Sequence, residues 1–223
     1  MKLTHWLFAG LFASTSLHAQ QDVIEPATQK IEMRYSTLYG KLKQNVKEGH
    51  DDVKIAFFLL DQRDGSVCEI HKASMRKDAH YEELSIPASN EMSVPVDNNL
   101  RQANPDVTFV IDEGITCDVS MQVIAKGSYG NQISQTDVAV LTPQMNQLLS
   151  DLGGMFSGWF MPEVAGIVVH FAEPLSQPVT FSNGQQAEVQ GKTLILPLSS
   201  LGENELLTLE QPVVKVTPWV PRA

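Results

Sequence analysis

Apolar and polar residues alternate along much of the chain, with the period of two that is typical of half-buried β-strands. In the clearest run the apolar positions are Ile115, Cys117, Val119, Met121 and Val123, and every residue between them is polar or β-branched polar. We therefore expect a strand here, with these five side chains facing the core. The same kind of pattern predicts further strands at residues 31–35, 164–171, 179–181, 193–198, 206–209 and 213–217.

Helical signals are fewer and shorter. Residues 36–47 carry apolar side chains on one helical face, and Ser36 can cap the first turn. Residues 143–152 follow Thr142 as a capping residue, with proline at the first helical position, and end at a pair of glycines. Residues 74–84 are expected to form a charged helix. The pattern as a whole predicts an α+β fold dominated by strands, in antiparallel sheets or a sandwich with a few short helices.

Two segments resemble one another. From Leu42 and again from Leu100 the chain reads Leu-basic-Gln, then a polar turn, then Asp-Val opening an apolar run. Each run reaches an acidic-Gly turn, and two residues separate that turn from a cysteine. We interpret Leu42–Ile70 and Leu100–Val119 as an internal repeat, in which a helix end is followed by an antiparallel hairpin with its cysteine on the second strand.

The two cysteines of the chain, Cys68 and Cys117, are predicted to form a disulfide, since an even number of cysteines normally pairs in an oxidising compartment. Both fall on the apolar parity of their strands, so they are expected to meet in the core with Cα atoms within about 7 Å. The same parity places Glu69 and His71 on the outer face.

Export is predicted by the first residues. Lys2 precedes an apolar run, and Ala19 offers a small residue for cleavage, as in a secretory signal peptide. Residues 1–19 are therefore expected to be removed, which leaves 20–223 as a single globular unit or as two halves, 28–125 and 140–223. We expect a periplasmic protein without a transmembrane anchor after cleavage.

Charge and composition exclude several classes. The net charge is −10, and no basic patch stands out, which argues against nucleic-acid binding. No phosphate-binding glycine motif, nucleophile elbow or zinc-binding helix motif is present. No cofactor and no metal are expected, and the catalytic residues, if there are any, are unknown.

A few side chains are weak candidates for a pocket or a metal. Glu69 and His71 share one strand face, where they form either a metal-binding pair or a solvated charge pair. His170 interrupts an apolar strand, and is either a core histidine or a pocket residue. His50, beside two aspartates, is expected in a solvated turn. None of these selects a general acid–base pair.

The segment between Gly153 and Met161 carries large apolar side chains among glycines. Phe156, Trp159 and Phe160 either fill the end of the core or form an exposed surface for a partner in the envelope.

The stretches RYSTLYGKLKQNVKEGHDDV (34–53), the Gly-x-x-Cys-acidic-Ile block at Cys68, MPEVAGIVVHF (161–171) and LPLSSLGENELLTLEQPVVKVTPWVP (196–221) resemble an uncharacterised family of exported gamma-proteobacterial proteins, a domain of unknown function. The resemblance implies export and a Gram-negative envelope location, and it implies no active site.

Taken together, the sequence favours a soluble periplasmic protein that binds a ligand or assists an envelope process without catalysis. The alternative is a periplasmic hydrolase or metal-dependent enzyme, with Glu69, His71 and His170 as the residues to test.

Overall fold

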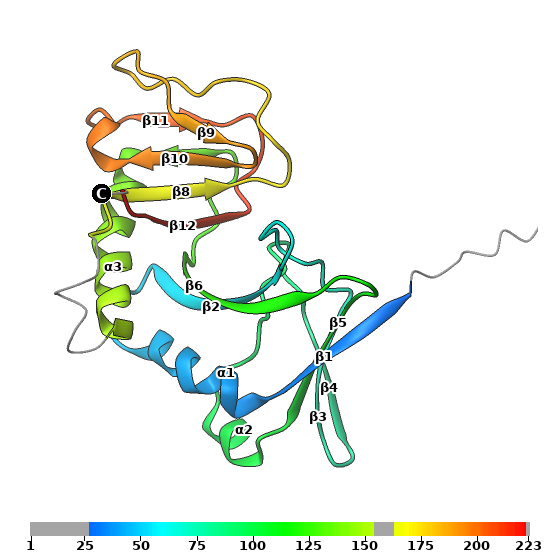
Figure 1. Ribbon diagram of the computed structural model, residues 1–223. Coiled ribbons are helices and arrows are strands. Elements are labelled where there is room, and N and C mark those ends of the chain that lie inside the picture. Colours follow the sequence, from blue (N-terminus) through cyan, green and yellow to red (C-terminus); the bar gives the residue numbers. More distant parts are fainter. Residues whose placement is uncertain (1–26, 154–162, 222–223) are drawn as a thin grey trace, which may run out of the picture.

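The computed structural model describes residues 27–153 and 163–221, and they build the layers shown in Figure 1. The helices are α1 (Tyr35–Leu42), α2 (Asn98–Ala103) and α3 (Gln135–Gly153), with 3-10 turns at Lys43–Val46 and Leu198–Ser200. The strands are β1 (Thr28–Arg34), β2 (Val53–Asp61), β3 (Lys72–Lys77), β4 (His80–Leu84), β5 (Asp106–Asp112), β6 (Cys117–Ala125), β7 (Gln132–Ser134), β8 (Gly166–His170), β9 (Glu188–Gln190), β10 (Thr193–Pro197), β11 (Leu206–Thr208) and β12 (Lys215–Trp219).

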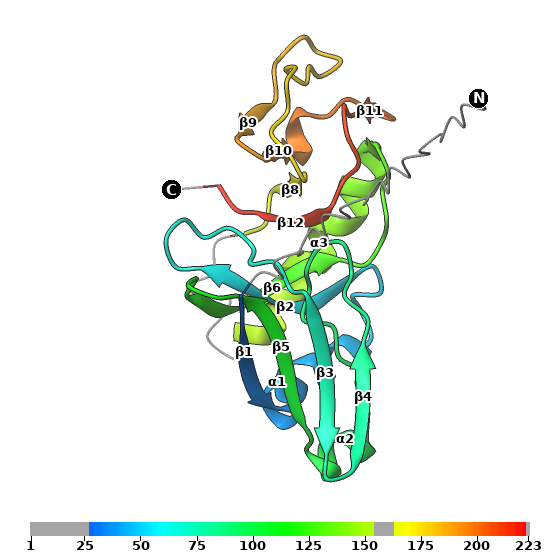
Figure 2. The same cartoon turned by 90° about the vertical axis from the view of Figure 1, so that its right-hand side faces the viewer.

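The lower layer is a four-stranded antiparallel sheet in the order β1-β5-β3-β4. Its central strand β5 alternates strictly, with Val107, Phe109 and Ile111 buried and the residues between them more exposed. This is the pattern of a sheet with one face on the core and one face in solvent. Helices α1 and α2 contact each other beside this sheet, as Figures 1 and 2 show.

The middle layer is the antiparallel pair β2–β6, in which Val53 lies opposite Ala125 and Asp61 opposite Cys117. Strand β2 is buried on both faces. Ile55, Phe57 and Leu59 join the main core, whereas Ala56 and Phe58 pack with Ile124 in a second, smaller cluster on the opposite face.

The upper layer is a second antiparallel sheet in the order β12-β8-β10-β9, next to the short pair β7–β11. Helix α3 contacts both the middle and the upper layer, touching β2, β6, β8 and β12. It does so with a continuous apolar stripe at helical spacing, formed by Val138, Leu141, Met145 and Leu148. One core therefore runs through both layers along this helix.

Most of the predicted strands are confirmed, and so is the class: antiparallel sheets dominate, with few helices. The disulfide between Cys68 and Cys117 is also confirmed, with Cα atoms 6.7 Å apart. Cys68 lies next to β2, where its backbone N–H donates to the carbonyl of Leu59, and Cys117 begins β6. The bridge therefore joins the two segments that flank the end of β2.

The predicted helix at 74–84 is wrong, because these residues form the β3–β4 hairpin. Ala73 and Met75 are buried at a spacing of two, and a two-residue turn follows in which Asp78 has a φ of +51°. Aspartate tolerates that left-handed conformation better than most residues, so the turn was readable from the sequence.

The predicted start of the helix before Gly153 is also wrong, since α3 begins at Gln135 and contains Pro143. The true start is marked by Ser134 and Asp137. The Ser134 hydroxyl oxygen accepts a hydrogen bond from the backbone N–H of Asp137, and the Asp137 carboxylate accepts one from the backbone N–H of Ser134. This reciprocal pattern is a capping box.

The structure does not show the predicted helix-hairpin repeat. Both copies contain a helix end and a strand, followed by a glycine with positive φ, which is Gly65 in the first copy and Gly114 in the second. In the second copy, however, β5 pairs with β1 and β3, and β6 crosses to pair with β2. Two of the expected core positions on β6 are consequently exposed at this sheet edge, Val119 by 47% and Met121 by 41%.

Candidate functional site

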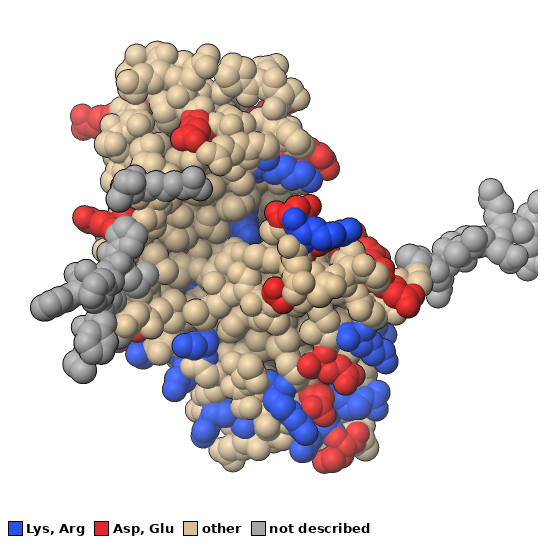
Figure 3. Space-filling view, in the orientation of Figure 1, with Lys and Arg blue, Asp and Glu red and all other residues tan. Residues whose placement is uncertain are grey.

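A cleft of about 1000 Å³ lies between the middle and upper layers, and we call it the central cleft. Figure 3 shows it as the hollow between the upper and lower parts of the molecule. Its walls come from the end of β2 and the turn after it, from the loop before α2, and from β6, β8, β10 and β12. Lining residues include Leu60, Val67, Glu69, Ser89, Gln122, His170, Phe171, Lys192, Val214, Lys215, Thr217 and Pro218.

Lys215 is the cation in the interior of this cleft. Strand parity directs it away from the core, because its neighbour Val216 is the buried residue of β12. Its ammonium donates to the side-chain oxygen of Gln122 at 2.9 Å and lies 4.1 Å from the centroid of the Phe58 ring, a cation–π contact. Burial lowers the pKa of Lys215 to about 8. Among residues 27–153 and 163–221, no carboxylate forms an ion pair with it.

His170 lies opposite Lys215 on the neighbouring strand β8. Its Nε2 is 2.8 Å from the hydroxyl of Thr217, which projects from the same side of β12 as Lys215. Burial, and secondarily the positive charge of Lys215, lower the pKa of His170 to about 4. At neutral pH the pair therefore carries one positive charge, on Lys215.

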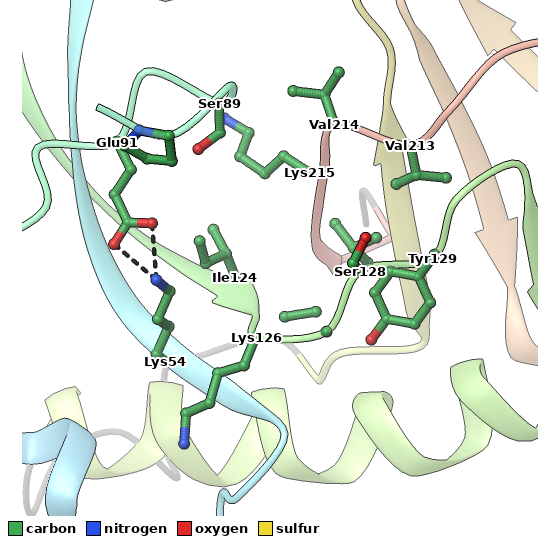
Figure 4. A pocket seen from close by; sticks show the side chains of 14 residues that line it. Lys54, Ser89, Glu91, Ile124, Lys126, Ser128, Tyr129, Val213, Val214 and Lys215 are labelled. Atoms are coloured by element: carbon green, nitrogen blue, oxygen red, sulfur yellow. Dashed lines mark hydrogen bonds and ion pairs between the residues drawn. The ribbon is translucent and has the colours of Figure 1, made fainter. Parts of the chain in front are cut away.

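A smaller pocket of about 230 Å³ adjoins the central cleft and shares Ser89, Val214 and Lys215 with it. Figure 4 shows Lys215 extending from β12 toward the loop that carries Ser89. Across the pocket, the Lys54 ammonium is neutralised by both carboxylate oxygens of Glu91, at 2.9 and 2.8 Å. The Lys126 ammonium turns away and donates to the backbone carbonyl of His50 at 3.4 Å.

The three weak candidates are divided between two places. Glu69 and His170 both line the central cleft. His71 instead lies beside the lower sheet, where its Nε2 is 2.7 Å from Asp112 Oδ1, while its Nδ1 is 3.9 Å from Glu69 Oε1. Cys68 and Ile70 are buried, and Glu69 and His71 face outward.

In the part of the chain that the structure describes, no group of three or more His, Cys, Asp or Glu side chains is arranged so that it could hold a metal ion. Phe156, Trp159 and Phe160 lie outside the described residues, so a partner surface there stays a prediction.

The expectation of a solvated turn at His50 is wrong, because this side chain has no exposed area. It lies near the C-terminal part of α3, with Nε2 3.9 Å from a carboxylate oxygen of Asp151. The apolar run that starts at Val53 gave no indication that the preceding turn would be covered by a helix distant in sequence.

Sequence reasoning missed Lys215, Gln122 and Thr217 as site residues. The strand containing Lys215 and Thr217 was predicted, and one signal was available in it: a lysine at a single position of an otherwise apolar segment, Val-Val-Lys-Val. What no pattern showed is that His170 and Lys215 lie on paired strands, because that depends on sheet register.

The amino-acid sequence of this chain matches a known protein family. The model described as "Protein of unknown function (DUF2987)" matches residues 27–171. The chain belongs to this family. In this DUF2987 protein the matched range runs from β1 to β8 and includes Phe58, Gln122 and His170, whereas Lys215 and Thr217 lie beyond it. No curated protein and no solved structure matches the chain.

Within the described ranges, no helix is long and apolar enough to cross a membrane.

The low pKa of His170 predicts a specific acid sensitivity. An unfolded histidine takes up a proton near its usual pKa of 6.5, and the folded one does so only near 4. The stabilisation from keeping His170 neutral is therefore present above pH 6.5 and is lost as the pH falls toward 4. When the pH falls from 7 to 5, the free energy of unfolding, measured by urea denaturation, should decrease in the wild type. In His170→Gln the decrease should be smaller by about 1–2 kcal/mol. Equal losses in both proteins would contradict the assignment.

Lys215 is predicted to destabilise the fold. Because its folded-state pKa lies below the usual 10.5, holding it charged at pH 7 has a cost that Lys215→Met removes. We expect the free energy of unfolding to rise by about 1–2 kcal/mol, because methionine is an unbranched apolar side chain that carries no charge into this position. Lys192→Met is the matched control, since Lys192 is exposed and lies 3.8 Å from Glu173, and should change stability by less than about 0.5 kcal/mol. A clear loss of stability in Lys215→Met would show that the ammonium is well accommodated.

Proposed function

We propose that this DUF2987 protein is an exported binding protein of the Gram-negative envelope, which holds a small ligand in the central cleft. The observation that carries the proposal is the cleft itself. Its volume matches that of ligand sites, and its lining combines apolar walls with a few convergent polar groups, Gln122, His170, Lys215 and Thr217.

Export is supported by the sequence at the N-terminus and by the disulfide. Disulfides persist mainly in oxidising compartments, and this one joins the buried Cys68 to the partly buried Cys117 at the edge of the main core. Resemblance to exported envelope proteins adds to this argument.

A binding role is better supported than hydrolysis. The contact between His170 and the Thr217 hydroxyl has the length of a nucleophile–base pair. A base with a pKa near 4 is nevertheless a poor proton acceptor at neutral pH, because general bases work best with a pKa near the operating pH. The same contact suits a polar wall that fixes the orientation of a ligand. Metal-dependent catalysis by Glu69, His71 and His170 together is not favoured, since His71 faces Asp112 beside the lower sheet.

Export has a direct chemical signature. Protein purified from the periplasmic fraction of its own host should begin at Gln20, because cleavage follows Ala19. Unreduced, denatured protein should also resist thiol labelling, because Cys68 and Cys117 are bonded. Intact mass measured before and after labelling tests both points. A mass that includes residues 1–19, or a labelled cysteine, would contradict export through an oxidising compartment.

Blocking the central cleft should abolish binding. Ala172 is exposed and lines the cleft, so Ala172→Trp places an indole in it; Ala103→Trp, at the end of α2, adds the same side chain outside it. The probe is the fluorescent dye 8-anilinonaphthalene-1-sulfonate, titrated into each protein. We expect saturable binding to the wild type and to Ala103→Trp, and an affinity lower by about tenfold or more in Ala172→Trp. Equal binding to all three proteins would show that the cleft is not the site.

A further inference from the structure

The central cleft contains a positive charge, on Lys215, that no negative charge of the described residues balances by an ion pair. The chain carries a net charge of −10, yet the cation inside the cleft, Lys215, has no carboxylate partner in the described ranges. Two other lysines of the cleft region have carboxylate neighbours: Lys54 is paired with Glu91 at 2.8 Å, and the exposed Lys192 lies 3.8 Å from Glu173. A half-buried charge without a counter-ion lowers the stability of the fold. Buried charges in proteins are therefore normally paired with an opposite charge.

The ammonium is held in position but keeps unused donors. It has three N–H groups, and the described residues accept one hydrogen bond from it, through Gln122 Oε1. The Phe58 ring lies beneath it and is fully buried, which fixes the position of the amine over the floor of the cleft. Two N–H groups are thus available for a ligand oxygen at a defined place.

His170 adds to the selectivity of this place. Because it stays neutral at physiological pH, it does not bring a second positive charge beside Lys215. The neighbouring Thr217 hydroxyl can donate to a ligand oxygen or accept from a ligand hydroxyl. The group formed by Gln122, His170, Lys215 and Thr217 therefore carries a single positive charge.

Apolar side chains make up a large part of the remaining lining, whereas the charged residues Asp64, Glu69 and Lys192 that also line the cleft are exposed. Leu60 and Val67 pack on the cluster beneath the cleft, and Phe171, Val214 and Pro218 line the opposite side. A ligand that fills this volume needs an apolar body as well as its acidic group, because burial of apolar area supplies most of the binding free energy in such pockets.

We propose that the central cleft binds a small amphiphilic organic anion, whose acidic group is held by the ammonium of Lys215 and whose apolar body lies along Leu60, Val67 and Phe171. This inference rests on the proposed binding function and adds the chemical class of the ligand.

The test compares two dyes that differ in charge. 8-Anilinonaphthalene-1-sulfonate carries a sulfonate, and N-phenyl-1-naphthylamine has the same ring system without it. Both are titrated into the wild type, Lys215→Met and the control variant Lys77→Met, whose exposed lysine ends β3 and does not line the cleft. We expect the wild type to bind the sulfonate about tenfold or more tightly than the neutral dye, since a charge-assisted hydrogen bond contributes a factor of this size. Lys215→Met should remove this preference without weakening the binding of the neutral dye, and Lys77→Met should keep the preference.

Competitors separate an amphiphilic ligand from a bare anion. Octanoate and octyl phosphate should each displace the sulfonate dye, whereas inorganic phosphate at the same concentration should not. Displacement by inorganic phosphate alone would overturn the requirement for an apolar body.

The outcomes also separate this inference from the proposed function. Equal affinities for the two dyes, both lowered in Ala172→Trp, would overturn the anion preference and leave the binding function standing. Retention of the preference in Lys215→Met would assign the charge recognition elsewhere and overturn the role of Lys215. No binding of either dye up to about 1 mM, or binding that is unchanged in Ala172→Trp, would overturn both proposals.

Discussion

Strand β2 buries side chains on both of its faces, and the arrangement of the layers follows from this. Ile55, Phe57 and Leu59 pack into the main core on one side, while Ala56 and Phe58 require cover on the other. A two-stranded sheet such as β2–β6 cannot bury two faces by itself, so it is stable only between other layers. Helix α3 holds the upper sheet against the middle pair, and the disulfide fixes the segments on either side of the end of β2.

The upper sheet does not pack closely along the whole of β2, and the space left between the middle and upper layers is the central cleft. The ammonium of Lys215 lies over Phe58, where an apolar residue would pack more favourably. The neighbouring His170 is likewise held in its neutral form by burial. Polar side chains at such positions lower stability, and proteins keep unfavourable groups of this kind mainly where a ligand or a reaction uses them. This is the physical reason for seeking the function of the protein at the cleft.

The sequence predicted local features well where they depended on nearby residues. The strands β8 and β12, the second of which contains Lys215, and the buried parity of Cys68 could all be read from spacing. The β3–β4 hairpin and the start of α3 also had local signals, in the turn at Asp78 and in the Ser134–Asp137 capping box.

What could not be read was strand pairing between distant segments. Nothing in the residues after Gly114 shows that β6 leaves β5 to pair with β2, and the apparent repeat pointed to the opposite conclusion. The exposure of Val119 and Met121 follows from that pairing, as does the burial of His50 from the packing of α3. The candidate site is non-local in the same way: His170 was singled out by its apolar surroundings, but its proximity to Lys215, Gln122 and Phe58 is a product of sheet register and layer packing.

The central claim is that Lys215 is a desolvated cation whose missing partner is a ligand anion. It is tested most directly by the titration of its amine, followed by NMR of protein with ¹³C-labelled lysine side chains and assigned through Lys215→Met. Without ligand, the Lys215 signal should titrate with a pKa near 8, well below the usual 10.5. Saturation with 8-anilinonaphthalene-1-sulfonate should raise this pKa by about one unit or more, because a bound anion favours the charged form. A Lys215 signal that titrates at the usual value, or one whose pKa the bound dye does not change, would contradict the account.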